Sequence, residues 1–236
     1  MRRENPWHIR LPQASHDQWF KNLVDLHELT NIWINDLKVD QPSHVLTRGL
    51  SNEIRDQLWM LDTLAQANLD QFLDANQPHE LLLQLEKTIW AVQSWTLQQI
   101  LNDEALKPRS SSPIKNLLEQ ISWKAGRRIG ETRWVQAKNF GQMDLAALFF
   151  ALQDSPLSGS PQYPPSLIRR ATPSVLEIEL RHCPHQLPFA EIRSNEDLLC
   201  LMHSQWSRGF VYSLNQRVSI EHKIESPRCV QRWQLG

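Results

Sequence analysis

The spacing of apolar residues changes once along this chain, and the change constrains its fold more than any other feature. Up to about residue 152, apolar side chains recur every three to four positions, the period of amphipathic α-helices. After Pro173 the period becomes two, as in a half-buried strand, and apolar residues alternate with charged ones: Leu176, Ile178 and Leu180 against Glu177, Glu179 and Arg181. Separate segments with the two periods predict a fold of the α+β class.

The N-terminal part is predicted to form three long amphipathic helices, over residues 15–38, 51–76 and 78–104. Because the connections between them are short, we expect a helical bundle over residues 1–108. The polar, proline-containing stretch 107–113 then breaks the helical period, as a linker does. A second domain is therefore predicted over residues 113–236.

This second domain is predicted to be an α/β module, in which helices pack on a small antiparallel sheet. The stretch 155–173 contains five Pro and is expected to lack regular structure over most of its length. Before it we expect two helices, over 113–138 and 144–152. After it we expect a strand over 175–181, a helix over 195–208 closed by Gly209, and a C-terminal hairpin with strands over 218–225 and 229–235 that turns at Ser226-Pro227.

Composition and motifs exclude several classes of function. With 25 basic and 26 acidic residues the chain has a net charge of −1, so nucleic acid is not an expected partner. No apolar run approaches the ~18 residues that span a bilayer, and no apolar signal segment follows the first residues. Three Cys, an odd number, fit a reducing compartment, and we expect a cytoplasmic protein. Phosphate-loop, dinucleotide, HExxH and GxSxG motifs are absent.

The densest group of metal-ligating residue types lies in two short segments of the C-terminal half. Cys183 and His185 follow the predicted strand, and Cys200 and His203 lie on adjoining turns of the next helix. Together they could supply two Cys and two His to a tetrahedral zinc ion. Two alternatives stay open. In the first, Cys200 is a buried core thiol, His203 is a partly exposed helix residue, and His182 and His185 border a loop; in the second, Cys183 is a nucleophile with a neighbouring His as its base.

A second candidate feature is the segment Trp123 to Glu131, which has Gly126 and Gly130 inside a helical pattern. Each Gly costs about 1 kcal/mol relative to Ala in a helix, so such residues usually permit close approach of another backbone or of a ligand. The cations of this segment, Arg127 among them, form either a phosphate-binding face or a solvated surface.

These motifs occur in an order that resembles the 4-vinyl-reductase-like domains and their aminothiazoline-carboxylate hydrolase-like relatives, over roughly residues 114–235. The motifs are the two-glycine helix, Cys183-Pro184, Leu199-Cys200, Trp206 with Gly209-Phe210, and a terminal hairpin with Cys229. The chain departs from the family pattern where Ser226-Pro227 replaces a Gly-Asp turn and where His203, not Asp, stands three residues after Cys200.

The resemblance implies an antiparallel sheet covered by helices, a pocket for a small molecule or acyl chain, and a homodimer. The resemblance and the motifs together give ten candidate ligand-binding residues: Trp123, Gly126, Arg127, Gly130, Cys183, His185, Cys200, His203, Trp206 and Phe210.

Three functions are compatible with these features. The first is a ligand-binding or sensory module, with Leu176, Ile178 and Ile220 among the residues expected to line an apolar pocket. The second is an interaction or assembly protein that docks a partner through Trp-rich helices: Trp19, Trp33, Trp59, Trp90 and Trp95. The third is a Cys/His-dependent hydrolase. We rank them in this order, because the first requires no catalytic residue.

Overall fold

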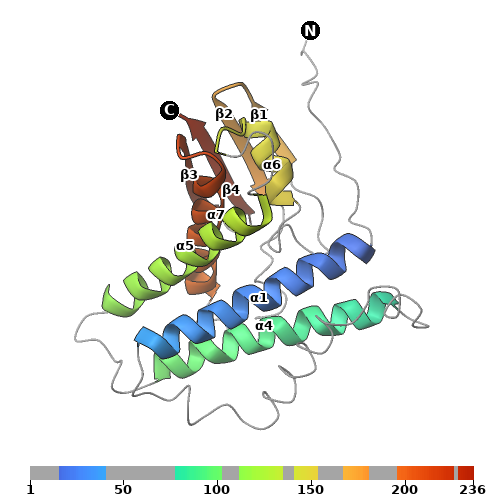
Figure 1. Ribbon diagram of the computed structural model, residues 1–236, viewed down its shortest axis with the longest axis vertical. Coiled ribbons are helices and arrows are strands. Elements are labelled where there is room, and N and C mark those ends of the chain that lie inside the picture. The colour runs from blue at the N-terminus through green and yellow to red at the C-terminus, as the bar shows by residue number, and fades with distance from the viewer. Residues whose placement is uncertain are drawn as a thin grey trace.

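Five helices and a four-stranded antiparallel sheet make up the part of the chain that the structure describes, which confirms the predicted α+β class (Figure 1). The structure is a computed structural model, and it describes residues 16–40, 78–102, 112–134, 141–153, 167–180, 196–225 and 228–236. The predicted helix over 51–76 and the segment with Cys183 and His185 lie outside these ranges.

Two long helices form a layer of their own. α1 (His16–Asp40) and α4 (Pro78–Asn102) lie side by side, and both run in the same direction (Figure 1). Two hydrogen bonds show this direction, because Trp19 meets Glu86 and the later residue Thr30 meets the later residue Gln93. Both helices begin and end close to their predicted bounds.

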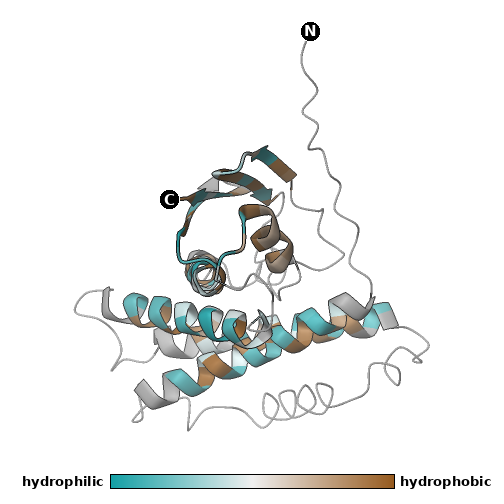
Figure 2. Cartoon of the chain, turned by 45° about the horizontal axis from the view of Figure 1, so that its top comes forward, coloured by the Kyte–Doolittle hydropathy of each residue, from teal (hydrophilic) through white to brown (hydrophobic). Residues whose placement is uncertain are grey.

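A second helical pair lies between this layer and the sheet. α5 (Ser112–Trp134) packs extensively against α7 (Glu196–Leu214) and also contacts α1, and α6 (Leu145–Gln153) packs on α7. Figure 2 shows polar residues on the outward faces of the long helices. Since α7 contacts α5, α6 and the sheet, it is the central element of the fold.

The sheet has the strand order β1-β2-β4-β3, with β1 (Leu167–Ala171), β2 (Val175–Leu180), β3 (Val218–Glu225) and β4 (Arg228–Leu235). β3 and β4 form the predicted C-terminal hairpin, and every neighbouring pair is antiparallel. One connected core joins apolar residues of the helical layer, of α5 to α7 and of the sheet. The predicted division near residues 108–113 stays a prediction.

One strand was not expected, and two local predictions were wrong. The stretch 155–173, expected to lack regular structure over most of its length, contains the strand β1, which pairs with β2 despite the nearby prolines. Gly209 does not close its helix, because α7 continues to Leu214 and uses this Gly where α5 crosses it. Glu179, expected on the solvent face, is only 5% exposed, because Arg169 of β1 covers it and binds its carboxyl group at 2.6 Å.

Arg169 therefore has a predictable role in sheet stability. Replacing it with alanine leaves the buried Glu179 carboxyl group without this cation, and we expect the free energy of unfolding to fall by about 1 to 3 kcal/mol. Arg170→Ala is the matched control, because Arg170 is an exposed neighbour on the same strand. Urea denaturation monitored by circular dichroism measures both, and equal losses in the two variants would contradict the role given to Arg169.

No helix in the described ranges is long and apolar enough to cross a membrane.

Candidate functional site

The two-glycine segment lies where α5 and α7 cross at close range. A Cβ atom on Gly126 would overlap the carbonyl oxygen of Trp206 and lie 3.0 Å from the amide nitrogen of Phe210. Reciprocally, a Cβ atom on Gly209 would overlap the carbonyl oxygen of Trp123. At both glycines the missing side chain thus leaves room for the backbone of the other helix. The sequence had left open whether a backbone or a ligand approaches such glycines.

Gly130 extends the crossing by one turn. A Cβ atom there would overlap the Ser213 hydroxyl oxygen, and this hydroxyl donates a hydrogen bond to the Phe210 carbonyl at 2.7 Å. Gly126 and Gly130 on α5 therefore face Gly209 and Ser213 on α7, each pair spaced by four residues. Small residues at this spacing form the continuous face that a close helix crossing needs.

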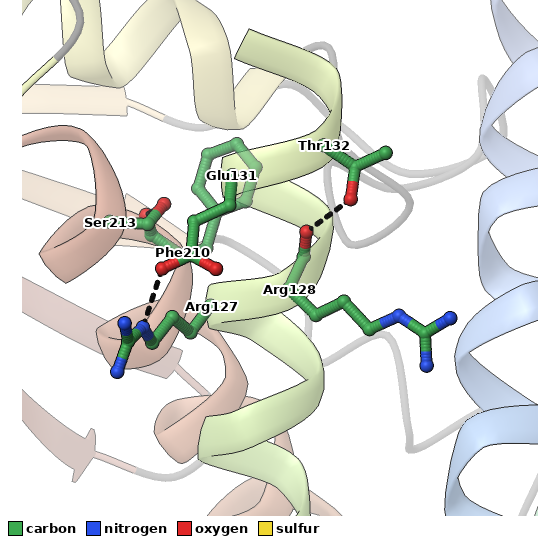
Figure 3. A network of polar contacts seen from close by, with 6 residues as sticks. All are labelled: Arg127, Arg128, Glu131, Thr132, Phe210 and Ser213. Carbon is green, nitrogen blue, oxygen red and sulfur yellow. Dashed lines mark hydrogen bonds and ion pairs between the residues drawn. The ribbon is translucent and has the colours of Figure 1, made fainter. Parts of the chain in front are cut away.

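Arg127 and Trp123 lie at the outer side of this crossing. Arg127 is about half exposed, its Nε donates to Glu131 at 2.6 Å, and its guanidinium group lies 5.8 Å from the centre of the Trp123 ring. The bond to Glu131 raises the pKa of Arg127 further above its ordinary value. Figure 3 shows Arg127 and Arg128 on different sides of α5, with Arg128 directed toward α1. These two cations do not form one face, which favours the solvated surface over the phosphate site.

Cys200 and His203 contact different parts of the fold, although they lie on the same helix. Cys200 is buried against Cys229 of β4 and Leu180 of β2, and both cysteines are thiols. His203 is also buried, with its ring 5.3 Å from the Trp90 ring and 5.9 Å from the Trp33 ring. Cys200 thus contacts the sheet, whereas His203 contacts the helical layer.

The other two candidate zinc ligands, Cys183 and His185, lie outside the described residues. Within the described ranges, no group of three or more His, Cys, Asp or Glu side chains is placed to hold a metal ion. The four-residue zinc site stays a prediction.

Trp206 and Phe210, the last two candidate residues, are fully buried on α7. Their rings stack with centres 5.1 Å apart and planes at 15°. Trp19, Trp33 and Trp90 are also buried, whereas Trp59 and the side chain of Trp95 lie outside the described part of the structure. An interaction role for the Trp-rich helices therefore cannot use these three side chains as surface anchors.

Sequence reasoning missed a buried carboxyl group between two indoles. Glu86 accepts a hydrogen bond from Trp19 Nε1 at 3.1 Å and a longer one from Trp90 Nε1 at 3.5 Å. Trp90 in turn contacts His203, so these contacts connect α1 and α4 to α7. The signal was present in the sequence, because Glu86 falls on the apolar face of its helix between Leu82 and Trp90.

Other buried polar atoms were also missed, among them one side-chain atom on each of α1, α4, α5 and α7. Within the described residues, no hydrogen-bond partner exists for the indole nitrogens of Trp33 on α1 and Trp206 on α7, or for the hydroxyls of Ser94 on α4 and Ser122 on α5. All four side chains are at least nine-tenths buried. Buried polar groups nearly always have a partner, so each of these requires an explanation.

The two serines differ from other hydroxyl residues of the same helices. Thr30 on α1 and Thr96 on α4 are buried and donate to the carbonyl four residues earlier, both at 2.8 Å. This bond is the usual way in which a hydroxyl inside a helix is satisfied. Ser94 and Ser122 do not form it, although both lie in regular helix. Their hydroxyls are thus available to another group.

These atoms lie on four helices that contact one another where the helical layer meets α5 and α7. Trp33 contacts His203 on α7, and Ser94 lies one turn after Trp90, which also contacts His203. Ser122 lies one turn before Gly126, the residue that meets the Trp206 backbone. We call Trp33, Ser94, Ser122 and Trp206 the interlayer polar set.

Comparisons with protein-family models, with curated proteins and with solved structures find no match for this chain.

Proposed function

We propose that the protein binds a small, largely apolar or acyl-type molecule in the layer where α1, α4, α5 and α7 meet. The interlayer polar set is the observation that carries the proposal, because its two indole N–H groups and two hydroxyls are buried without protein partners in the described ranges. An isolated buried donor or hydroxyl costs about 1 to 3 kcal/mol, and a bound molecule with a hydrogen-bonding group removes that cost.

The surroundings of this set determine the class of molecule. The other buried residues of these four helices are mainly aromatic and aliphatic, among them Trp90, Leu118, Ile121, Met202 and Phe210. No Lys or Arg is among the buried residues of the described chain. An apolar body with one or two polar atoms fits such a lining, whereas a multiply charged anion does not.

The resemblance to 4-vinyl-reductase-like domains supports the same proposal, because it implies a pocket for a small molecule or acyl chain. We also propose that the protein works in a reducing compartment such as the cytoplasm. Cys200 and Cys229 are neighbours in the core and are both thiols, as expected where disulfides are not formed.

The first test is native mass spectrometry, with metal analysis, of protein purified without added ligand. A molecule of a few hundred daltons that copurifies supports the proposal and gives the ligand class. If none copurifies, titration with decanoate and with decanol, followed by tryptophan fluorescence, tests acyl chains with and without a carboxylate. Absence of any bound molecule, together with no response to either probe, would overturn it. Stoichiometric zinc would instead support the predicted Cys/His site.

Ser94→Ala and Ser122→Ala separate a binding role from a structural one. Because each removes a buried hydroxyl without a protein partner, we expect the ligand-free protein to gain up to about 1 kcal/mol of stability. The same variants should bind the copurifying molecule about tenfold more weakly, the loss of one buried hydrogen bond.

Thr96→Val is the matched control, since its buried hydroxyl on α4 already donates to Val92. It should lower stability slightly and leave ligand affinity unchanged. Thermal unfolding with and without ligand measures both quantities. Lower stability in both serine variants, with no change in affinity, would assign the hydroxyls to structure alone.

A further inference from the structure

Gln93 of α4 carries a buried amide oxygen that has no hydrogen-bond partner in the part of the chain that the structure describes. The side chain is 1% exposed, so bulk solvent does not reach this oxygen. The amide nitrogen of the same side chain donates to the Thr30 hydroxyl on α1 at 2.8 Å. One half of the amide is thus bonded, and the other half requires a donor.

The Thr30 hydroxyl determines which way the Gln93 amide is turned. A hydroxyl has a single proton, and Thr30 donates it to the Leu26 carbonyl at 2.8 Å. Toward Gln93 the Thr30 oxygen can therefore act only as an acceptor, so the amide nitrogen must face it. Turning the amide round would place two acceptor oxygens against each other. The amide oxygen is consequently the atom that is left for another group.

The bond between Gln93 and Thr30 lies close to the contacts that connect the helical layer to α7. Gln93 is one turn after Trp90, whose ring contacts His203. Thr30 is one turn before Trp33, whose ring also contacts His203. Residues three positions apart on a helix are neighbours on its surface. The Gln93 amide is therefore beside Trp33, a member of the interlayer polar set.

Gln93 and Trp33 require opposite partners. The Gln93 oxygen accepts only and needs a donor, whereas the Trp33 indole nitrogen donates only and needs an acceptor. A single hydroxyl or primary amide group supplies both a donor and an acceptor. A carboxylate supplies acceptors alone, and it would place a negative oxygen against the Gln93 oxygen. The pair therefore selects a head group that can both donate and accept.

The buried charges of the described chain also disfavour an anionic head group. On α4, Glu86 lies two turns before Gln93 on the same face, and it is 6% exposed. No Lys or Arg is buried within the described ranges, so none of these buried residues can neutralise a carboxylate. Bringing an unpaired charge into such surroundings costs far more than one hydrogen bond returns.

We propose that the head group of the ligand is neutral and both donates and accepts, as an alcohol or a primary amide does, and that Gln93 determines this specificity. The inference rests on the proposed function, because it requires a molecule in the layer where α1, α4, α5 and α7 meet. It also extends that function, because an apolar layer for acyl chains does not by itself distinguish an alcohol from a carboxylate.

Three probes with the same decyl chain test the head group on the full, unchanged protein. Decanol donates and accepts, decyl methyl ether only accepts, and decanoate is a charged acceptor. Titration at neutral pH, followed by tryptophan fluorescence, should show that decanol binds about tenfold more tightly than the ether, the effect of one hydrogen bond. Decanoate should bind at least about a hundredfold more weakly than decanol.

Gln93→Met tests the residue itself, because methionine has a similar length and lacks the amide acceptor. Decanol should then bind about as weakly as the ether, whereas the affinity for the ether should not change. Gln84→Met is the matched control, since Gln84 is an exposed residue of the same helix, and it should leave both affinities unchanged. Circular dichroism of each variant reports whether the fold is retained.

Failure of this inference can be told apart from failure of the proposed function. Binding of decanoate or of the ether as tight as that of decanol would overturn the head-group assignment while supporting a ligand layer. An unchanged preference for decanol in Gln93→Met would overturn the role of Gln93. No response to any of the three probes, with no copurifying molecule, would overturn both proposals. The comparison of probes needs no variant, so it decides the head group even if Gln93→Met does not fold.

Discussion

Replacing Gly126 with alanine is expected to lower the free energy of unfolding by about 2 to 4 kcal/mol, although alanine is normally the better helix former. The added methyl group would overlap the Trp206 carbonyl, and this backbone atom cannot rotate away as a side chain can. α5 and α7 would have to separate along their whole contact, which lies at the centre of the core. Urea denaturation followed by tryptophan fluorescence measures the loss.

Two substitutions on the same helix provide a graded comparison. Gly130→Ala meets mainly the Ser213 hydroxyl, which can turn aside once it gives up its bond to Phe210, so its loss should be clearly smaller than that of Gly126→Ala. Lys124→Ala is exposed and should change stability by less than about 0.5 kcal/mol. A Gly126→Ala variant as stable as Lys124→Ala would show that the crossing is looser than described.

Replacing Glu86 with alanine is expected to lower the free energy of unfolding by about 2 to 4 kcal/mol, because two buried indole N–H groups lose their acceptor. The effect should be visible in the fluorescence of the folded state, since Trp19 and Trp90 are the donors. Equilibrium denaturation together with the emission spectrum of the folded protein measures both changes.

Glu86→Gln keeps one acceptor oxygen, so it should retain part of the lost stability. Lys87→Ala controls for the change in the helix itself, since Lys87 is the exposed neighbour on α4. We expect Glu86→Ala to be the least stable of the three variants. The same loss for Lys87→Ala and Glu86→Ala would mean that the indole contacts contribute little.

Much of the fold could be predicted because hydrophobic period is a local signal. The helices that became α1, α4, α5, α6 and α7, the strand β2 and the terminal hairpin were all expected near their observed positions. β1 was missed because its partner, β2, lies beyond a turn, and only the pairing outweighs the prolines nearby. Gly209 was placed at a helix end because a Gly after an apolar stripe usually marks one, and the crossing with α5 is a tertiary contact.

The candidate site was less predictable, because its contacts are tertiary and the hydrophobic period reports only local structure. Gly126 and Gly130 could be marked as positions of close approach, but the sequence did not reveal that the approaching group is the α7 backbone. Cys200 and His203 are close in sequence, yet one contacts the sheet and the other contacts Trp33 and Trp90. Ser94 and Ser122 carry no pattern at all, because only the three-dimensional arrangement shows which hydroxyls lack a carbonyl partner.

The crossing of α5 and α7 has a consequence for how the chain folds during synthesis. It joins residues that are far apart in the sequence, because Gly126 meets Trp206, which is 80 residues later (206 minus 126). At a translation rate of roughly 5 to 20 residues per second, α5 is complete about 4 to 16 s before its partner has been synthesised. During that interval the small-residue face of α5 and the apolar face of α1 are exposed to the cell. A chaperone that holds nascent helices should therefore engage this protein until α7 has left the ribosome.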